Sequence, residues 1–201
     1  RQASTVDVRA KHWTVLAVWI LPLLAAPPIF SHDAYSYAAQ GWLMENDINP
    51  YEGYPGLLPG VFADQVAQEW RFTRTPYGPL SLQLQHDIVR LAGFHPYWSA
   101  VMMRIPALVG VVLIGVFLPR LARRTGHDAS FAAWFGVLNP LLVVDFVGGA
   151  HNDSFMMGLM VFGLWLATTA SWAWIPAALV IGASAAVKQP AVMLSLIHIS
   201  E

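Results

Sequence analysis

The sequence contains no cysteine, which excludes disulfide bonds and metal sites that depend on thiolate ligands. Charged residues are also scarce: they make up 11% of the 201 residues, whereas about a quarter is usual in a soluble domain. Hydrophobic residues make up 56%. These proportions exclude an ordinary soluble domain and predict an all-α integral membrane protein, and no nucleic-acid partner is expected.

The apolar residues gather in five runs, each of which predicts a membrane-spanning helix. A span needs about 20 residues, and a shorter run suffices where flanking charged side chains reach the interface. The predicted spans cover residues 13–30, 99–119, 129–147, 154–170 and 174–193. The first run has no small-residue cleavage site and ends at Pro27 and Pro28, so it is interpreted as a retained span rather than a signal peptide.

Basic residues flank two of these runs and predict the orientation of the chain. Arg9 and Lys11 precede the first run, while Arg120 and Arg123 follow the second. Positive charge marks the cytoplasmic side of a membrane span. Residues 31–97, which lie between these two runs, are therefore predicted to form a large external loop on the extracytoplasmic side.

Two helices and a turn are expected inside this loop. Apolar side chains recur at helical spacing within residues 34–44 and 80–91, which predicts two amphipathic helices that lie in the membrane interface. In the first helix they are Tyr35, Ala38, Ala39, Trp42 and Leu43, and in the second they are Leu80, Leu84, Ile88 and Leu91. Residues 49–56 combine proline, glycine and aromatic side chains, which predicts a rigid turn.

Asp33 lies just beyond the end of the first run and is the leading candidate for a functional residue. A carboxylate at the interface stays ionised and can meet both a lipid headgroup and a water-soluble substrate. An enzyme that acts on a lipid-linked substrate needs its base at this depth. The alternative is that Ser31 or Asp33 only caps the helix that begins near Ala34.

A second polar cluster, His151, Asn152 and Asp153, follows the third run and is predicted to reach the same external side as Asp33. Lys188 lies in the outer part of the fifth run, where it needs water, an anionic headgroup or another partner. Two alternatives stay open. The cluster could be a helix cap after a Gly-Gly turn, and Asp33, His151 and Asp153 could be metal ligands.

These residues suit one class of reaction. Transfer from a donor with a phosphate leaving group needs a base only for the incoming hydroxyl, because phosphate departs without being protonated. Glycoside hydrolysis would need a second carboxyl group to protonate the departing alcohol. The phosphate would be held by Lys188, by Arg104 or by the amides at the helix start near Asp153. Arg104 could instead only snorkel to lipid headgroups.

An ordered series of motifs adds a resemblance to a known family. The motifs are Asp33-x-Tyr35-Ser36-Tyr37-Ala38-Ala39-Gln40-Gly41, Asn49-Pro50-Tyr51, Pro76-Tyr77-Gly78-Pro79-Leu80, Asn139-Pro140-Leu141, Gly149-Ala150-His151-Asn152-Asp153 and Lys188-x-Pro190-Ala191. The series extends over residues 13–193 and resembles the actinobacterial polyprenol-phosphomannose-dependent alpha-1,6-mannosyltransferases. These enzymes belong to the GT-C glycosyltransferases.

The resemblance implies a multispan GT-C enzyme of the cell membrane with an extracytoplasmic active site. Asp33 would act as general base in the transfer of mannose from polyprenol-phosphate-mannose to an alpha-1,6-mannan acceptor of the lipomannan type. No cofactor and no resident metal are expected. The residues expected to contact substrate are His32, Tyr35, Tyr77, Arg104, His151, Asn152, Asp153 and Lys188.

Two other functions stay open. One is a transporter or lipid flippase in which these ionisable residues form a relay, although transporters normally place such groups near the bilayer midplane. The other is a GT-C enzyme with a different polyprenol-linked sugar donor.

The extent of the native domain is also predicted. Members of the family continue through further spans, so residues 1–193 are expected to be the N-terminal part of a single transmembrane domain. Residues 194–201 resemble a translated sequencing adapter, and we predict that they are not native.

Overall fold

The computed structural model describes the backbone of residues 5–189 and the side chains of residues 11–189. Within this part of the chain every regular element is a helix and no strand forms, in agreement with the predicted all-α class. The motif residues from Pro190 onward and the adapter-like residues 194–201 lie outside the described residues.

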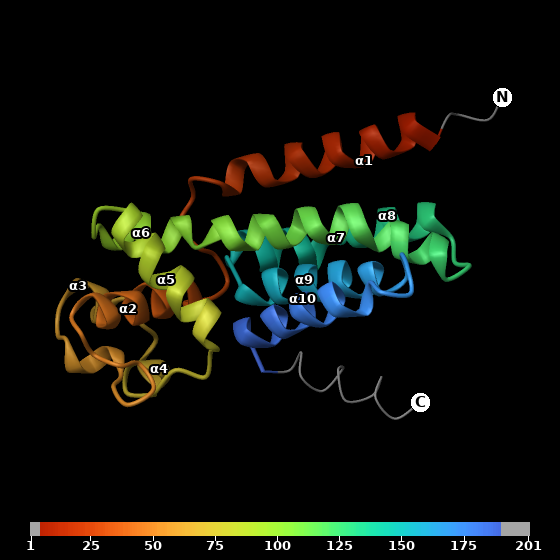
Figure 1. Cartoon of the computed structure of the whole chain (residues 1–201). Helices are drawn as coiled ribbons and strands as arrows, with labels where there is room; N and C mark the ends of the chain where they lie inside the picture. Colours follow the sequence, from red (N-terminus) through yellow and green to blue (C-terminus); the bar gives the residue numbers. More distant parts are fainter. Residues whose placement is uncertain (1–4, 190–201) are drawn as a thin grey trace.

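The helices divide into a bundle and a group at one end of it, which we call the head (Figure 1). The bundle contains α1 (Thr5–Ile20), α7 (Arg104–Arg124), α8 (Ala129–Val137), α9 (Asn152–Ala167) and α10 (Trp174–Val187). The head contains α2 (Asp33–Glu45), α3 (Val61–Asp64), α4 (Gln68–Arg71), α5 (Pro79–Leu91) and α6 (Pro96–Met102). The remaining elements are the 3₁₀ helices η1 (Leu21–Leu23) and η2 (Pro55–Leu57) and the π-helix η3 (Leu142–Gly148).

Each part is organised around one helix. In the bundle, α7 packs against both α8 and α9, and α9 packs against α10. In the head, α2 packs against α3, α5 and α6. Because α5 also packs against α10, the head is joined to the bundle through the end of the last described helix.

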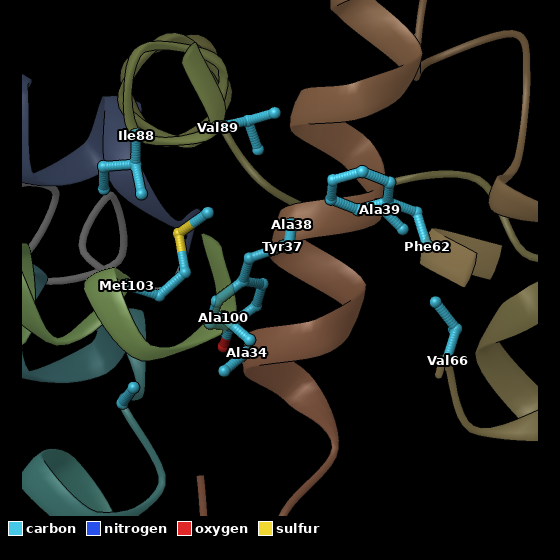
Figure 2. Packing of buried hydrophobic residues seen from close by; sticks show 11 residues of the cluster. Ala34, Tyr37, Ala38, Ala39, Phe62, Val66, Ile88, Val89, Ala100 and Met103 are labelled. Carbon is cyan, nitrogen blue, oxygen red and sulfur yellow. The ribbon is translucent and has the colours of Figure 1, made fainter. Parts of the chain in front are cut away.

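Side chains on every face of α2 are buried (Figure 2). Phe62 and Val66 lie on one side of α2, while residues of α5 and α6 and Met103, which precedes α7, lie on the other. The buried side chains of α2 are Ala34, Ser36, Tyr37, Ala38, Ala39, Gln40 and Leu43, together with Gly41. The prediction of an amphipathic helix over residues 34–44 is therefore wrong, because α2 has packing partners on both sides.

The second helix of the head, α5, covers the residues predicted for it but buries a different face. Ser81, Gln85 and Ile88 are buried, whereas Leu91 is 70% exposed. Gln85 Nε2 donates to Ser81 Oγ at 2.9 Å, which partly satisfies the buried polar groups. A Cβ on Gly41 of α2 would collide with the Gln85 backbone, so the close approach of the two helices selects this face.

The first predicted span, residues 13–30, is not one continuous helix. The α1 helix ends at Ile20 and η1 adds a single turn. Pro22, Pro27 and Pro28 explain this ending, because proline has no backbone N–H to donate to the preceding helical turn.

One helical run in residues 5–189, Pro96–Arg124, is long and apolar enough to cross a membrane, in agreement with the predicted span over 99–119. The third predicted span is bent by 48° between α8 and η3, because Pro140 interrupts the helix there. It counts as a second membrane crossing only if α8 and η3 together form one broken span. The α9 and α10 helices are apolar but have 16 and 14 residues. The five spans remain a prediction.

The helices α7 and α9 approach so closely that their backbones touch at two glycines. A Cβ on Gly110 would collide with the backbone of Ser154, and one on Gly158 would collide with the backbone of Gly110. Ser154 Oγ also donates to the carbonyl of Ala107 at 2.7 Å. The core of the bundle therefore depends on the absence of side chains at this crossing.

We expect Gly110→Ala to lower the free energy of unfolding by about 1 to 3 kcal/mol, as overpacking usually does. The matched control is Gly182→Ala on α10, where a Cβ meets no atom within 4 Å and alanine favours the helix by up to about 1 kcal/mol. Thermal unfolding in detergent should show a lower midpoint for the first variant only. Equal midpoints would contradict the close crossing of α7 and α9.

Candidate functional site

A single buried arginine ties together the segments that precede Asp33 and His151. Arg104, at the start of α7, is 2% exposed, and its guanidinium donates to four backbone carbonyls. The acceptors are the carbonyls of Ala26 at 2.6 Å, Pro27 at 3.2 Å, Val147 at 2.8 Å and Gly148 at 3.1 Å. Ile29 N adds a hydrogen bond to the Gly148 carbonyl at 3.1 Å, so the two segments lie side by side.

Asp33 is the first residue of α2, and its carboxylate makes no capping hydrogen bond. Ser31 Oγ instead accepts from the Asp33 N–H at 3.1 Å. The Asp33 carboxylate accepts from the Tyr37 hydroxyl at 3.4 Å and lies 3.8 Å from Nε2 of His151. Its side chain is 35% exposed, so it is open to solvent while held on one side by the protein. Helix capping therefore does not explain this carboxylate.

The imidazole of His151 lies between two carboxylates at the start of α9. Its Nδ1 is 3.1 Å from Asp145 Oδ1 and its Nε2 is 3.8 Å from Asp33 Oδ2. Nε2 is buried and has no hydrogen-bond partner. A Cβ on Gly149 would press on both the Asp145 carbonyl and the His151 ring, so the ring position requires glycine there.

Asp153 and Lys188 form a second charged pair. Lys188 Nζ lies 2.9 Å from both carboxylate oxygens of Asp153, and the two side chains are 28% and 33% exposed. The prediction that Lys188 lies inside a helical span is wrong, because α10 ends at Val187 and Lys188 has extended backbone angles. The partner that its charge requires is a carboxylate of the neighbouring helix.

Tyr77 connects the two charged groups. Its backbone forms an isolated antiparallel bridge with Lys188, whose Nζ lies 5.8 Å from the Tyr77 ring centroid. The ring also packs edge-on against Tyr37, with centroids 5.0 Å apart. The Tyr51 hydroxyl donates to the Tyr77 carbonyl at 3.0 Å, which attaches the predicted 49–56 turn to the same place. A continuous row of side chains thus leads from Asp33 to Lys188.

Burial controls the protonation of the two tyrosines in this row. It raises the pKa of Tyr77 to about 12, and it raises the pKa of Tyr37 well above its usual value, with smaller contributions from Tyr77 and Asp33. Both hydroxyls therefore keep their protons near neutral pH. Tyr37 remains a donor to the Asp33 carboxylate across the physiological range.

A small cleft opens beside the Asp33 carboxylate. It is lined by Asp33, Ser36, Gln40, Trp70, Thr73, Arg74, Pro76 and Tyr77. Arg74 supplies an exposed guanidinium and Trp70 an exposed aromatic surface next to the carboxylate. A carboxylate, a cation and an aromatic surface are groups that can contact the hydroxyls, the phosphate and the ring of a sugar phosphate.

The structure separates the candidates into two sets. Asp33, Tyr77, His151, Asp153 and Lys188 are brought together around Tyr37 by the contacts above. His32, Tyr35, Asn152 and Arg104 are not part of this row. His32 is exposed and its ring centroid is 6.0 Å from that of Tyr35. The buried amide of Asn152 donates to Ser81 Oγ at 2.8 Å and joins α9 to α5.

The contacts do not favour the metal interpretation of Asp33, His151 and Asp153. Among residues 5–189, no three His, Asp or Glu side chains are arranged to hold a metal ion. Both oxygens of Asp153 are engaged by Lys188. The capping interpretation also receives no support, because no side-chain capping bond forms at His151, the residue before α9.

Sequence reasoning missed three residues of the site, Tyr37, Arg74 and Asp145. Asp145 carried a signal, since it is a lone acid in an apolar run and such residues usually have a partner. Arg74 precedes the Pro76-Tyr77 motif by two residues. Tyr37 belongs to the first motif but carried no signal of its own.

Comparison with known proteins places this sequence in a family. The family model described as "Alpha-(1->6)-mannopyranosyltransferase, N-terminal domain" matches residues 1–199. The chain belongs to the alpha-(1→6)-mannopyranosyltransferase family. No solved structure matches the chain.

Three members of the mannopyranosyltransferase family illustrate the similarity. Alpha-(1->6)-mannopyranosyltransferase A of Corynebacterium glutamicum is 34% identical over 98% of this chain and 41% of its own length. An alpha-(1->6)-mannopyranosyltransferase of Mycobacterium tuberculosis is 43% identical over 73% of the chain and 25% of its own length. A probable alpha-(1->6)-mannopyranosyltransferase of Mycolicibacterium smegmatis is 43% identical over 74% of the chain and 27% of its own length. The chain thus spans less than half the length of these relatives.

In this member of the mannopyranosyltransferase family, the Arg104 contacts predict a structural role. Arg104→Lys should lower the free energy of unfolding by about 2 kcal/mol or more, because an ammonium cannot reach all four carbonyls and each lost bond to a charged group costs about 1.5 to 3 kcal/mol. The control is Arg120→Lys on the same helix, whose exposed guanidinium bonds only the Val116 carbonyl. Equal thermal midpoints of the two variants in detergent would contradict this role.

Proposed function

We propose that this chain forms the N-terminal part of a membrane mannosyltransferase. The enzyme transfers mannose from polyprenol-phosphate-mannose to an alpha-1,6-mannan acceptor of the lipomannan type on the extracytoplasmic face, with Asp33 as general base. Family membership supports the mannosyl transfer, because the relatives are named alpha-(1->6)-mannopyranosyltransferases. The donor, the acceptor and the base are argued from the site.

The observation that carries the proposal is the position of the Asp33 carboxylate. It stands at the junction of head and bundle, half open to solvent, beside a cleft that contains a cation and an aromatic side chain. Tyr37 holds one of its oxygens, which fixes its orientation. A general base needs this combination of a fixed carboxylate and access for the reacting hydroxyl.

One base is enough for the reaction. The acceptor hydroxyl oxygen bonds to the anomeric carbon of mannose while the bond from that carbon to the phosphate oxygen breaks, and the electron pair leaves with the phosphate. The hydroxyl proton passes to Asp33. Polyprenyl phosphate is a weak base and leaves unprotonated, so no second acid is needed. Attack opposite the leaving group inverts the anomeric carbon.

Lys188 and Arg74 are the cations proposed to hold the donor phosphate. The ammonium of Lys188 has three N–H donors, of which Asp153 accepts two, and its side chain remains partly exposed. Arg74 lines the Asp33 cleft directly, so it can reach a phosphate on the mannose that faces this carboxylate. Arg104 is not proposed for this task, because its guanidinium is occupied by backbone carbonyls.

We also propose a multispan arrangement in which the head is extracytoplasmic. Arg120 and Arg123 lie at the opposite end of α7 from the head, and basic residues mark the cytoplasmic end of a span. Acidic and aromatic side chains of the head would then lie at the outer membrane surface, where Asp33 can meet a lipid-linked donor.

Asp33→Asn should lower transfer by about 10² to 10⁴, because the amide keeps the size of the side chain but cannot take a proton. The assay follows polyprenol-phosphomannose turnover by the full-length protein in membranes, with a polyprenol-linked arabinose as the competing donor. Asp87→Asn, an exposed residue of α5 bonded to Gln83, is the control and should keep full turnover. An Asp33 variant with a third of normal turnover would refute the base, and preference for arabinose would refute the donor.

The orientation can be tested separately, because the chain contains no cysteine and each introduced thiol is therefore unique. Gln65 in the head and Arg123 at the far end of α7 are both exposed. In intact cells an impermeant thiol reagent should label Gln65→Cys, and it should label Arg123→Cys only after permeabilisation. Labelling of both in intact cells would contradict the proposed topology.

A further inference from the structure

The Nε2 atom of His151 is a buried polar group without a hydrogen bond, and it points toward a carboxylate that has a proposed role. Leaving such an atom unsatisfied costs free energy, and native structures rarely contain a buried unpaired polar group without a reason. Asp33 Oδ2, at 3.8 Å, is its nearest charged neighbour. The protonation states of His151 and Asp33 must therefore explain why these two groups lie close together without a hydrogen bond.

The second nitrogen of the ring indicates which tautomer is present. Nδ1 lies 3.1 Å from Asp145 Oδ1 as an ion pair, and because a carboxylate only accepts hydrogen bonds this neighbour favours a proton on Nδ1. In the neutral ring the proton on Nδ1 leaves Nε2 with a lone pair. Nε2 and the Asp33 carboxylate then both act as acceptors, which explains why they face each other without forming a bond.

This mismatch disappears once Asp33 has taken a proton. A protonated carboxyl group donates through its O–H, and Nε2 is the acceptor that stands beside it. Closing from 3.8 Å to hydrogen-bond distance requires a movement of about 1 Å, and catalytic hydrogen bonds are often long before substrate binds. The arrangement is thus unsatisfied before proton transfer and satisfied after it.

We infer that His151 receives from Asp33 the proton of the acceptor hydroxyl, while Asp145 orients the ring and stabilises the imidazolium that forms; the inference rests on the proposed function. The O–H bond of the Asp33 carboxyl group breaks, the N–H bond at Nε2 forms, and Asp33 returns to its ionised state. Once the product has left, Nε2 gives this proton back through the partly exposed Asp33 carboxylate to solvent, which restores the neutral ring with its proton on Nδ1. His151 acts through Asp33 and is a positioning residue rather than a contact of the sugar.

The other charged groups around the ring are compatible with this role. Tyr37 donates to Asp33 and keeps its own proton, so it does not compete with His151 as an acceptor. Asp153 is neutralised by Lys188, and Arg104 is occupied by the carbonyls of the preceding segment. Asp145, at 49% side-chain exposure, gives the imidazolium a carboxylate partner at Nδ1.

The test is chemical rescue in the full-length protein in membranes. His151→Ala should lower kcat for mannosyl transfer about ten- to a hundredfold with little change in the donor KM, because the ring does not touch the donor. Added imidazole should restore a large part of kcat by occupying the space left by the ring. His151→Gln, which keeps more of the side-chain volume but cannot take a proton, should show the same loss without rescue.

The matched control is the second His–carboxylate pair of the head. His86 Nε2 lies 2.8 Å from Glu45 Oε2, at the opposite end of α2, about 18 Å from Asp33 at 1.5 Å per residue. His86→Ala should keep its kcat, and imidazole should not change it. This pair has the same chemistry but no contact with the proposed base.

The outcomes separate this inference from the proposed function. A His151→Gln variant with kcat within threefold of the unmodified protein, while Asp33→Asn is inactive, would overturn the role of His151 and leave the base intact. Loss of kcat in His151→Ala that imidazole does not change would also overturn it. Full activity of Asp33→Asn would refute the proposed base and the inference together.

Discussion

The site depends on the way in which the Arg104 guanidinium satisfies backbone carbonyls that have no helical partner. Residues 26–27 follow η1 and residues 147–148 are the last two of η3, and their carbonyls accept from the buried Arg104 side chain. An unpaired buried carbonyl is costly, and a single planar group with five donors meets four of them at once. The rigid guanidinium of Arg104 therefore determines how closely residues 26–27 and 147–148 approach each other. This approach in turn sets the separation of Asp33 and His151.

Backbone strain is concentrated in the residues just before Asp33 and His151. Phe30 has φ 63° and Ala150 has φ 57°, in the left-handed region that residues with a side chain rarely adopt. Each such conformation costs on the order of 1 to 3 kcal/mol and persists only where the surroundings enforce it. Here the Arg104 contacts and the Ile29–Gly148 hydrogen bond provide that enforcement. Strain and anchoring together direct both chain segments toward one point.

The sequence was informative about what kind of elements form and which polar residues matter, because these follow from composition and local spacing. The helix of residues 33–45 and the approach of Asp33 to His151 both follow from such patterns. Three features did not: the buried polar face of α5, the end of α10 before Lys188, and the pairing of Lys188 with Asp153. The first depends on the close approach of Gly41 to the Gln85 backbone. The other two lie where Gly78 meets the Ala186 backbone and donates to the Val187 carbonyl, contacts between distant segments that no local pattern encodes. The role of Arg104, which the sequence suggested as a substrate contact, was hard to predict for a related reason, since its partners are backbone carbonyls rather than side chains.

The bridge between Tyr77 and Lys188 has a consequence for the order in which the site is made. Asp33 and Tyr77 leave the ribosome early, whereas His151 and Lys188 belong to α9 and the end of α10. Domains emerge from their N-terminus onward during synthesis. The nascent head therefore carries the Asp33 carboxylate without His151, without Lys188 and without the isolated backbone bridge to Tyr77. A chain interrupted before α9 would contain Asp33 without His151 and Lys188, so the row of side chains around Tyr37 is completed only after α9 and α10 have been synthesised.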